Sequence, residues 1–341
     1  MVNNNPIRIG IVGAGVSSST VHLPVLVARS EVVVEWICDL DISKAKSVAE
    51  RFSVSQSFSG IDQCPGVDIV ALTIPLNMRS SAFRLSLDRG WHVLMEKPFA
   101  ENLAHHIQMI DEAKNTGIQL GVMAQRRAYA QNYMASELLR SGILGSINRV
   151  WAADSDVVRR SGIDGDQWAS RIINHTTATG GYLEETGWHL IDTVFQIVDA
   201  AEIKVNAAVL DGIEGIDTEV QAESDVITKA GDEFKMALRL SRSRDIRRGI
   251  SIECEKGIIE VGNFPSGTAT LSNTDGLYVC DIDKAHKFAR SGYAAIHQHW
   301  QAFIDQCKTE IPSLASAESA ILTTQFIEDV KATSSWGGGN G

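Results

Sequence analysis

The chain has 341 residues, which exceeds what one hydrophobic core usually supports, so we expect two domains. Its hydrophobic fraction of 44% and charged fraction of 21% are those of an ordinary soluble protein, and its net charge of −11 disfavours nucleic-acid or anionic-membrane partners. No apolar run reaches the roughly 20 residues of a membrane span, and the N-terminus has no signal-peptide pattern. Five scattered cysteines without a CxxC pair favour a reduced, cytoplasmic protein that holds no zinc.

The first predicted element is a β-strand over residues 7–12, an apolar and β-branched run typical of a central parallel strand. The turn that follows, Gly13 to Ser18, reads GxGxxG with serine in the third glycine position. Its glycines permit a tight turn and close approach to a pyrophosphate, and the next helix offers its N–H groups to the phosphates. We assign five residues of this turn to dinucleotide binding: Gly13, Gly15, Val16, Ser17 and Ser18.

A second predicted strand, residues 32–38, ends at Asp39, about 20 residues after the glycine turn. A carboxylate at this distance accepts hydrogen bonds from the ribose hydroxyls and repels a 2′-phosphate. The sequence therefore favours NAD as cofactor. Asp41 and Lys44 close by leave NADP as the alternative.

Strands and helices continue to alternate up to residue 125, which predicts a doubly wound parallel sheet, a Rossmann domain over residues 1–125. One of these strands, residues 92–95, runs into Glu96-Lys97-Pro98, and proline cannot extend a central strand. Ligands of such sheets lie outside the carboxyl ends of the strands, so Lys97 is placed where a cofactor would bind. The alternative is a surface ion pair at a strand end.

A helix is predicted from Tyr182 to Val198, and its polar residues form one narrow stripe: Glu185, His189, Asp192 and Gln196. The stripe is either the solvated face of an amphipathic helix or part of a site. A solvated stripe usually carries lysine or arginine, and this one carries neither. We therefore favour the site, with an acid one helical turn before a histidine.

Residues 126–341 are predicted to form an α+β domain on a largely antiparallel open sheet, closed by helices over 294–308 and 316–332. We expect the glycine-rich tail from Trp336 to Gly341 to be disordered. The histidines at 105–106 and 297–299 are interpreted as helix-surface residues, without a metal. Five arginines would bind a phosphate or, as we prefer, form a solvated hairpin turn: Arg239, Arg242, Arg244, Arg247 and Arg248.

Taken in order, these motifs resemble those of the Gfo/Idh/MocA family of NAD(P)-dependent oxidoreductases, named after glucose–fructose oxidoreductase and inositol dehydrogenase. The motifs are the Gly13–Ser18 turn, Thr73-Ile74-Pro75-Leu76-Asn77, Glu96-Lys97-Pro98, Gln125-Arg126-Arg127, Trp168 with Arg171, and Gly180-Gly181 leading to Gly187–Asp192. The resemblance implies that one face of the second sheet covers the active site and that the other packs on a neighbouring subunit of a homodimer or homotetramer.

The same resemblance implies catalytic roles for Lys97, His189 and Glu185, although the family usually has aspartate at the last position. It also implies that Arg79 replaces a histidine. Cofactor contacts are extended to Thr73, Ile74, Pro75, Asn77, Glu96, Lys97 and Gln125, and substrate contacts to Arg127, Trp168, Arg171, Glu185 and His189.

The expected activity is hydride transfer between nicotinamide and a secondary hydroxyl or ketone of a sugar, a sugar derivative or an inositol-like polyol. An imidazole with a pKa of about 6.5 suits His189 to the general-base role. Lys97 would polarise the oxygen and Glu96 would position Lys97, unless a depressed pKa makes the lysine the proton carrier. The alternatives are an NAD-dependent glycosidase and a non-catalytic dinucleotide sensor on the same fold.

Overall fold

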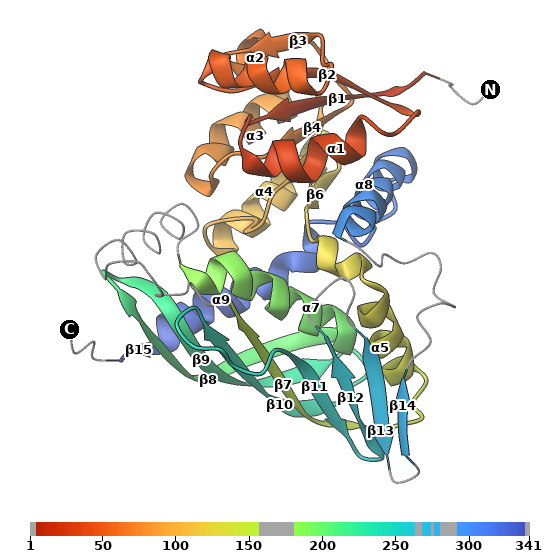
Figure 1. Ribbon diagram of the computed structural model, residues 1–341, viewed down its shortest axis with the longest axis vertical. Coiled ribbons are helices and arrows are strands. Elements are labelled where there is room, and N and C mark those ends of the chain that lie inside the picture. Colours follow the sequence, from red (N-terminus) through yellow and green to blue (C-terminus); the bar gives the residue numbers. More distant parts are fainter. Residues whose placement is uncertain (1–4, 157–180, 263–267, 274–275, 280–291, 338–341) are drawn as a thin grey trace. The chain divides into compact units, whose positions relative to one another are not determined.

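The structure is a computed structural model that describes residues 5–156, 181–262, 268–273, 276–279 and 292–337 (Figure 1). The chain divides into two compact units. The first comprises residues 1–125 and 292–320, and the second comprises 126–291 and 321–341. The predicted boundary after residue 125 coincides with the division. However, the predicted second domain was continuous to residue 341, whereas residues 292–320 fold with the first unit.

This return of the chain has a packing cause. Helix α8 (Gly292–Thr309) buries Trp300, Phe303 and Ile304 in the same hydrophobic core as Ile9 of the first strand. All four side chains are completely buried. The apolar face of α8 is therefore satisfied by the first unit, a long-range contact that the helical pattern of the sequence does not reveal.

The first unit contains the parallel sheet that the sequence predicts. Among the described residues its strand order is β3-β2-β1-β4-β5-β6, and every adjacent pair is parallel. Because the order reverses beside β1, ligands are expected at the carboxyl end of that strand. The strands are β1 (Ile7–Val12), β2 (Val32–Cys38), β3 (Gln56–Phe58), β4 (Ile69–Leu72), β5 (His92–Met95) and β6 (Leu120–Val122).

Polar caps fix where the helices between these strands begin. Asp41 accepts hydrogen bonds from the N–H groups of Ser43 and Lys44, and Asn102 accepts one from His105, so that two helices start at defined residues. The helices are the π-helical turn η1 (Ser18–His22), α1 (Leu23–Leu26), α2 (Ile42–Arg51), α3 (Arg79–Asp88) and α4 (Leu103–Thr116), with short 3₁₀ turns η2 (Ile61–Gln63) and η3 (Leu76–Met78).

The second unit contains a mixed sheet with the strand order β14-β13-β12-β11-β7-β10-β9-β8-β15 among the described residues. Only the pairs β7/β10 and β8/β15 are parallel there, so the prediction of a largely antiparallel open sheet is confirmed. The strands are β7 (Ile147–Ser155), β8 (Ala200–Ile213), β9 (Ile216–Thr228), β10 (Glu233–Ser241), β11 (Gly249–Cys254), β12 (Gly257–Val261), β13 (Ala269–Asn273), β14 (Gly276–Val279) and β15 (Ser334–Trp336).

Helices of the second unit lie on one face of this sheet (Figure 1). They are the 3₁₀ turn η4 (Gln125–Ala128), α5 (Ala130–Arg140), the π-helical turn η5 (Leu183–Gly187), α7 (Trp188–Val198) and α9 (Ile321–Thr333), which is preceded by η7 (Glu318–Ala320) in the first unit. No helix of the described residues combines the length and the apolar character that crossing a membrane requires.

The end of the chain corrects one expectation. Trp336, predicted to begin a disordered tail, lies in β15 and pairs with Leu210 of β8, and the N–H of Gly337 donates to the Leu210 carbonyl at 2.8 Å. Residues 338–341 of the predicted tail lie outside the described residues. The edge of β8 that faces away from β9 supplies the partners of β15. The glycine-rich composition of the tail does not reveal this pairing.

Candidate functional site

The glycine turn after β1 leaves room for a dinucleotide. Gly13 has a φ of +103°, and a Cβ there would lie 2.8 Å from the Thr73 carbonyl, so the position requires glycine. At Gly15, by contrast, nothing lies within 4 Å of where a Cβ would be. This open space beside the backbone fits the close approach of a pyrophosphate.

Two side chains tie neighbouring segments to the turn. The Thr73 hydroxyl lies 2.9 Å from the Val12 carbonyl and 3.1 Å from the Gly13 carbonyl, and it joins the loop after β4 to the glycine turn. Asp39 Oδ2 accepts a hydrogen bond of 2.8 Å from the N–H of Ala14. The acid predicted to bind ribose therefore lies against the glycine turn, where its oxygens keep lone pairs for a ligand.

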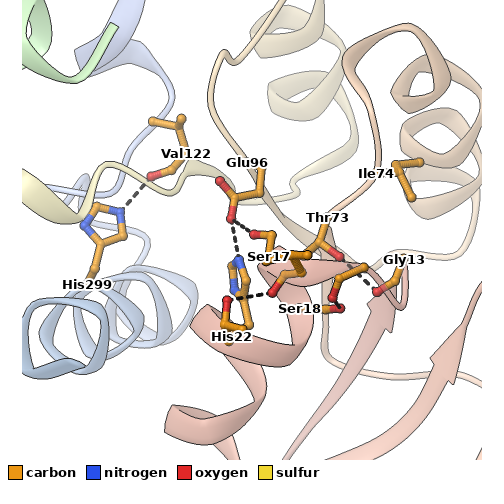
Figure 2. Close-up of polar contacts among 12 residues, drawn as sticks. Gly13, Ser17, Ser18, His22, Thr73, Ile74, Glu96, Val122 and His299 are labelled. Atoms are coloured by element: carbon orange, nitrogen blue, oxygen red, sulfur yellow. Dashed lines mark hydrogen bonds and ion pairs between the residues drawn. The ribbon is translucent and has the colours of Figure 1, made fainter. Parts of the chain in front are cut away.

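Glu96 is the centre of a buried hydrogen-bond cluster at the same edge of the sheet (Figure 2). Its Oε1 accepts hydrogen bonds from the Ser17 hydroxyl and from Nε2 of His22, the latter at 2.8 Å. Burial alone would raise the pKa of the Glu96 carboxyl, but its interactions with His22, Ser17 and Lys97 together lower it to about 2. The carboxylate is therefore ionised at neutral pH and bound to the glycine turn, not exposed in a surface ion pair.

Arg79 fixes the backbone on either side of Lys97. Its guanidinium donates to the carbonyl oxygens of Glu96 and Pro98, and its Nε donates to the Ile74 carbonyl at 2.9 Å. Burial lowers the pKa of Arg79 to about 10, so it remains a cation at neutral pH. Arg79 thus joins the Thr73–Asn77 loop to the segment that carries the half-buried Lys97.

In the second unit, Asp192 belongs to a buried ion pair. Its two carboxylate oxygens face Nε and Nη2 of Arg127, with the Nε bond at 2.7 Å, and both side chains are 2% exposed. Thr323 Oγ1 lies 3.3 Å from the same carboxylate. A solvated face is therefore wrong for this member of the polar stripe, and Arg127, predicted to bind substrate, is bound to Asp192.

Glu185 has a partner that the sequence analysis missed. Its Oε2 forms an ion pair with Arg242, whose side chain is 2% exposed and whose guanidinium carbon lies 4.5 Å from the centroid of the Tyr182 ring. The sequence does carry a signal for this: Leu238, Leu240 and Arg242 alternate along β10 and its extension, and all three are buried.

Two other arginines of the basic cluster are exposed. Arg244 and Arg247 have side chains that are 66% and 68% exposed, and each pairs with a glutamate. The interpretation of a solvated hairpin turn thus applies to these two residues but is wrong for Arg242, because the strand alternation directs that side chain into the interior.

The start of η5 is fixed by Asp217, whose Oδ2 accepts a 2.7 Å hydrogen bond from the Leu183 N–H. Burial raises the pKa of the Asp217 carboxyl to about 6. Gly181 has a φ of +128°, and a Cβ there would lie 1.9 Å from Asp217 Oδ1. The second glycine of the Gly180-Gly181 motif is therefore required by its contact with this carboxyl group.

His189 is half-buried at the second position of α7, and its ring lies edge-on to that of Trp188 at a centroid distance of 5.7 Å. The Thr193 hydroxyl donates to its carbonyl at 2.7 Å. Gln125 begins η4, shortly after β6 ends at Val122. Two predicted substrate ligands, Trp168 and Arg171, lie outside the described residues.

Two histidines interpreted as surface residues are completely buried. His106 Nε2 lies 3.0 Å from the Ala317 carbonyl and His299 Nε2 lies 2.7 Å from the Val122 carbonyl (Figure 2). Tertiary packing between residues 292–320 and the rest of the first unit buries both rings. In the part of the chain that the structure describes, no group of three or more His, Cys, Asp or Glu side chains is arranged to hold a metal ion.

Comparisons with known proteins agree with this geometry. Residues 7–124 match the family described as "Oxidoreductase family, NAD-binding Rossmann fold". D-glucoside 3-dehydrogenase of Escherichia coli (strain K12) is 26% identical over 210 residues, which are 60% of this chain and 58% of that protein. Trans-1,2-dihydrobenzene-1,2-diol dehydrogenase of Macaca fascicularis is 31% identical over 150 residues, 41% of this chain and 43% of that protein. The chain thus spans less than two thirds of these curated relatives.

Two solved structures share the fold over nearly the whole chain. KijD10, a 3-ketoreductase from Actinomadura kijaniata in complex with NADP and TDP-benzene, has a TM-score of 0.78 and 18% identity, covering 97% of this chain and 99% of that one. An oxidoreductase from Agrobacterium radiobacter in complex with NAD+, L-tartaric acid and magnesium has a TM-score of 0.78 and 14% identity, covering 96% of each chain.

Proposed function

Because the chain belongs to the Gfo/Idh/MocA family of oxidoreductases, we propose that it is a nicotinamide-dependent dehydrogenase or reductase that interconverts a secondary hydroxyl and a ketone of a sugar, a sugar derivative or a cyclic polyol. The observation that carries the proposal is the Glu96 cluster. Glu96 is bonded to Ser17 of an open glycine turn, and Lys97 is the next residue. A cation is thereby fixed at the edge of the sheet where the dinucleotide would bind.

The residues present fit a dinucleotide. Gly15 faces open space, and Asp39 lies against the turn with a carboxylate suited to ribose hydroxyls. The bound nicotinamide would supply the two-electron oxidation or reduction. We propose NAD as the preferred form, because a 2′-phosphate would meet the negative charge of Asp39.

We assign the proton transfer to His189, which would take the hydroxyl proton during oxidation and return it during reduction. Lys97 would donate a hydrogen bond to the same oxygen and stabilise the negative charge that develops on it. Glu185 would bind or orient the substrate. Lys97 belongs to the first unit and His189 to the second.

The names of the relatives support the substrate class. One acts on a D-glucoside, one is a 3-ketoreductase crystallised with a TDP compound, and one acts on a ring diol. Each name is consistent with a hydroxyl or ketone on a six-membered ring. We therefore propose a ring hydroxyl of a glycoside, nucleotide sugar or cyclitol as the group that reacts.

The test is a spectrophotometric assay of NAD and NADP reduction across glucosides, free aldoses, inositols, sugar phosphates and a trans-dihydrodiol. We expect turnover with at least one of them. Lys97→Ala and His189→Asn should each lower kcat/KM by roughly 10²–10⁴-fold. Lys46→Ala, a change to an exposed lysine in α2, serves as the matched control.

The outcomes separate the alternatives. Cleavage of a glycoside without net NADH would identify the glycosidase. Tight NAD binding without turnover of any compound would contradict the dehydrogenase and favour a dinucleotide sensor. Lys97→Ala with full activity would contradict the catalytic role assigned to Lys97.

A further inference from the structure

We propose that His22 is a positioning residue of the cofactor site, which holds the Glu96 carboxylate and, through it, the adjoining Lys97 in the geometry that the reaction needs. The inference rests on the proposed function, because Lys97 matters only if it acts on a substrate. His22 lies in η1, outside every motif singled out in the sequence, and its side chain is 1% exposed.

The His22 ring has one hydrogen-bond partner among the described residues, Glu96. Nε2 lies 2.8 Å from Glu96 Oε1, whereas Nδ1 is buried and has no hydrogen-bond partner among the described residues. An ionised carboxylate only accepts hydrogen bonds, so Nε2 must carry the proton and donate it. The histidine thus supplies a buried, charge-assisted hydrogen bond to Glu96.

An aromatic contact fixes the orientation of the His22 ring. The indole of Trp300, from α8, lies edge-on to the imidazole at a centroid distance of 5.6 Å and an interplanar angle of 84°. Trp300 is completely buried in the core of the first unit. A helix that returns late in the chain therefore supports the donor that holds Glu96.

The segment around Lys97 is held from two sides. Arg79 binds the backbone carbonyls of Glu96 and Pro98. His22 and Ser17 both bind the Glu96 side chain (Figure 2). Ser17 is half-buried in the turn that receives the cofactor, so His22 is the buried member of the two donors. Loss of His22 would leave the Glu96 side chain with the half-buried Ser17 hydroxyl as its remaining donor among these contacts, so that the carboxylate could rotate away from its place beside Lys97.

The test compares His22→Leu, which removes the donor, with His22→Gln, whose amide N–H can replace Nε2–H. We expect His22→Leu to lower kcat roughly 10- to 100-fold, because a small misplacement of a reacting group has an effect of this size. NAD affinity, measured by calorimetry, should change by less than about threefold. His22→Gln should restore most of kcat. His92→Leu, at the opposite end of β5, is the matched control for lost histidine contacts.

A second arm asks whether His22 acts through Glu96. In a Glu96→Gln background, His22→Leu should reduce kcat by less than about a further threefold. Three results would each overturn the inference. The first is a fold-loss of kcat by His22→Leu that is as large in the Glu96→Gln background as in the wild type. The others are a His22→Gln variant no more active than His22→Leu and a His22→Leu variant with wild-type kcat.

If His22→Leu does not fold, the hydrogen bond is tested in the unmutated ring. The ¹⁵N spectrum of labelled histidine should show His22 Nε2 protonated, and its signal should shift in Glu96→Gln. An unprotonated Nε2 or an unchanged signal would refute the inference. Absence of turnover by the wild-type protein would instead count against the proposed function, so the two failures are distinguishable.

Discussion

Arg242 extends from the end of β10 and forms an ion pair with Glu185 in the π-helical turn η5. The arginine side chain is 2% exposed and the glutamate side chain 17%. The resemblance to the Gfo/Idh/MocA family implies that aspartate is usual at position 185. The longer side chain of Glu185 reaches the Arg242 guanidinium, which lies over the Tyr182 ring. We interpret Arg242 as the residue that fixes the Glu185 carboxylate.

This pairing makes Glu185→Gln destabilising, because it leaves the Arg242 cation buried without its anion. We expect a loss of about 3–5 kcal/mol in the free energy of unfolding, measured by urea denaturation. The double variant Glu185→Gln with Arg242→Met should lose less than the sum of the single losses, since both charges are removed together. Strictly additive losses would contradict the pairing.

The buried pair of Arg127 and Asp192 leads to a second prediction. Lysine keeps the positive charge but cannot reproduce the two parallel hydrogen bonds of the guanidinium, so Arg127→Lys should lower the free energy of unfolding by about 1.5–3 kcal/mol. Arg244→Lys, in an exposed pair with Glu219, should cost about 0–1 kcal/mol. A stable Arg127→Lys variant with a raised KM would instead assign Arg127 to substrate binding.

The sequence predicted those features that depend on local pattern. The strand and glycine turn around Gly13, the acid at Asp39 and the lysine before Pro98 all follow from short-range chemistry, and each lies at the edge where parallel strands end. The contacts that position the functional residues could not be predicted from local sequence pattern. His22 and Trp300, like Glu185 and Arg242, come together only through tertiary packing, and no local period links their positions.

Cofactor preference gives a third prediction, centred on Asp39. Asp39→Ser removes the negative charge that would repel a 2′-phosphate, so the ratio of NAD to NADP affinity should fall roughly tenfold or more, as measured by calorimetry. Asp41→Asn, which alters the cap of α2, should leave that ratio unchanged. Equal effects of the two substitutions would show that the preference does not depend on Asp39.

The last prediction concerns pH and the Asp217 carboxyl, whose pKa burial raises from 3.8 to about 6. A group whose pKa is higher in the folded state binds more protons when folded. Its contribution to stability is therefore present at low pH and is lost as the pH rises from about 4 to about 6. Asparagine keeps an oxygen that can accept the Leu183 hydrogen bond but cannot ionise.

We therefore expect the wild type to lose stability relative to Asp217→Asn as the pH rises from 4 to 7. The difference between their free energies of unfolding should change by at most roughly 3 kcal/mol. The difference between the two proteins, taken from urea denaturation at each pH, removes the contributions of all other titrating groups. Glu96 does not obscure the comparison, because interactions with its neighbours lower its pKa to about 2 and its own transition lies at a lower pH. Parallel profiles for the two proteins across this range would mean that Asp217 is already ionised in the folded state at pH 4, and that its contact with the start of η5 does not require a neutral carboxyl group.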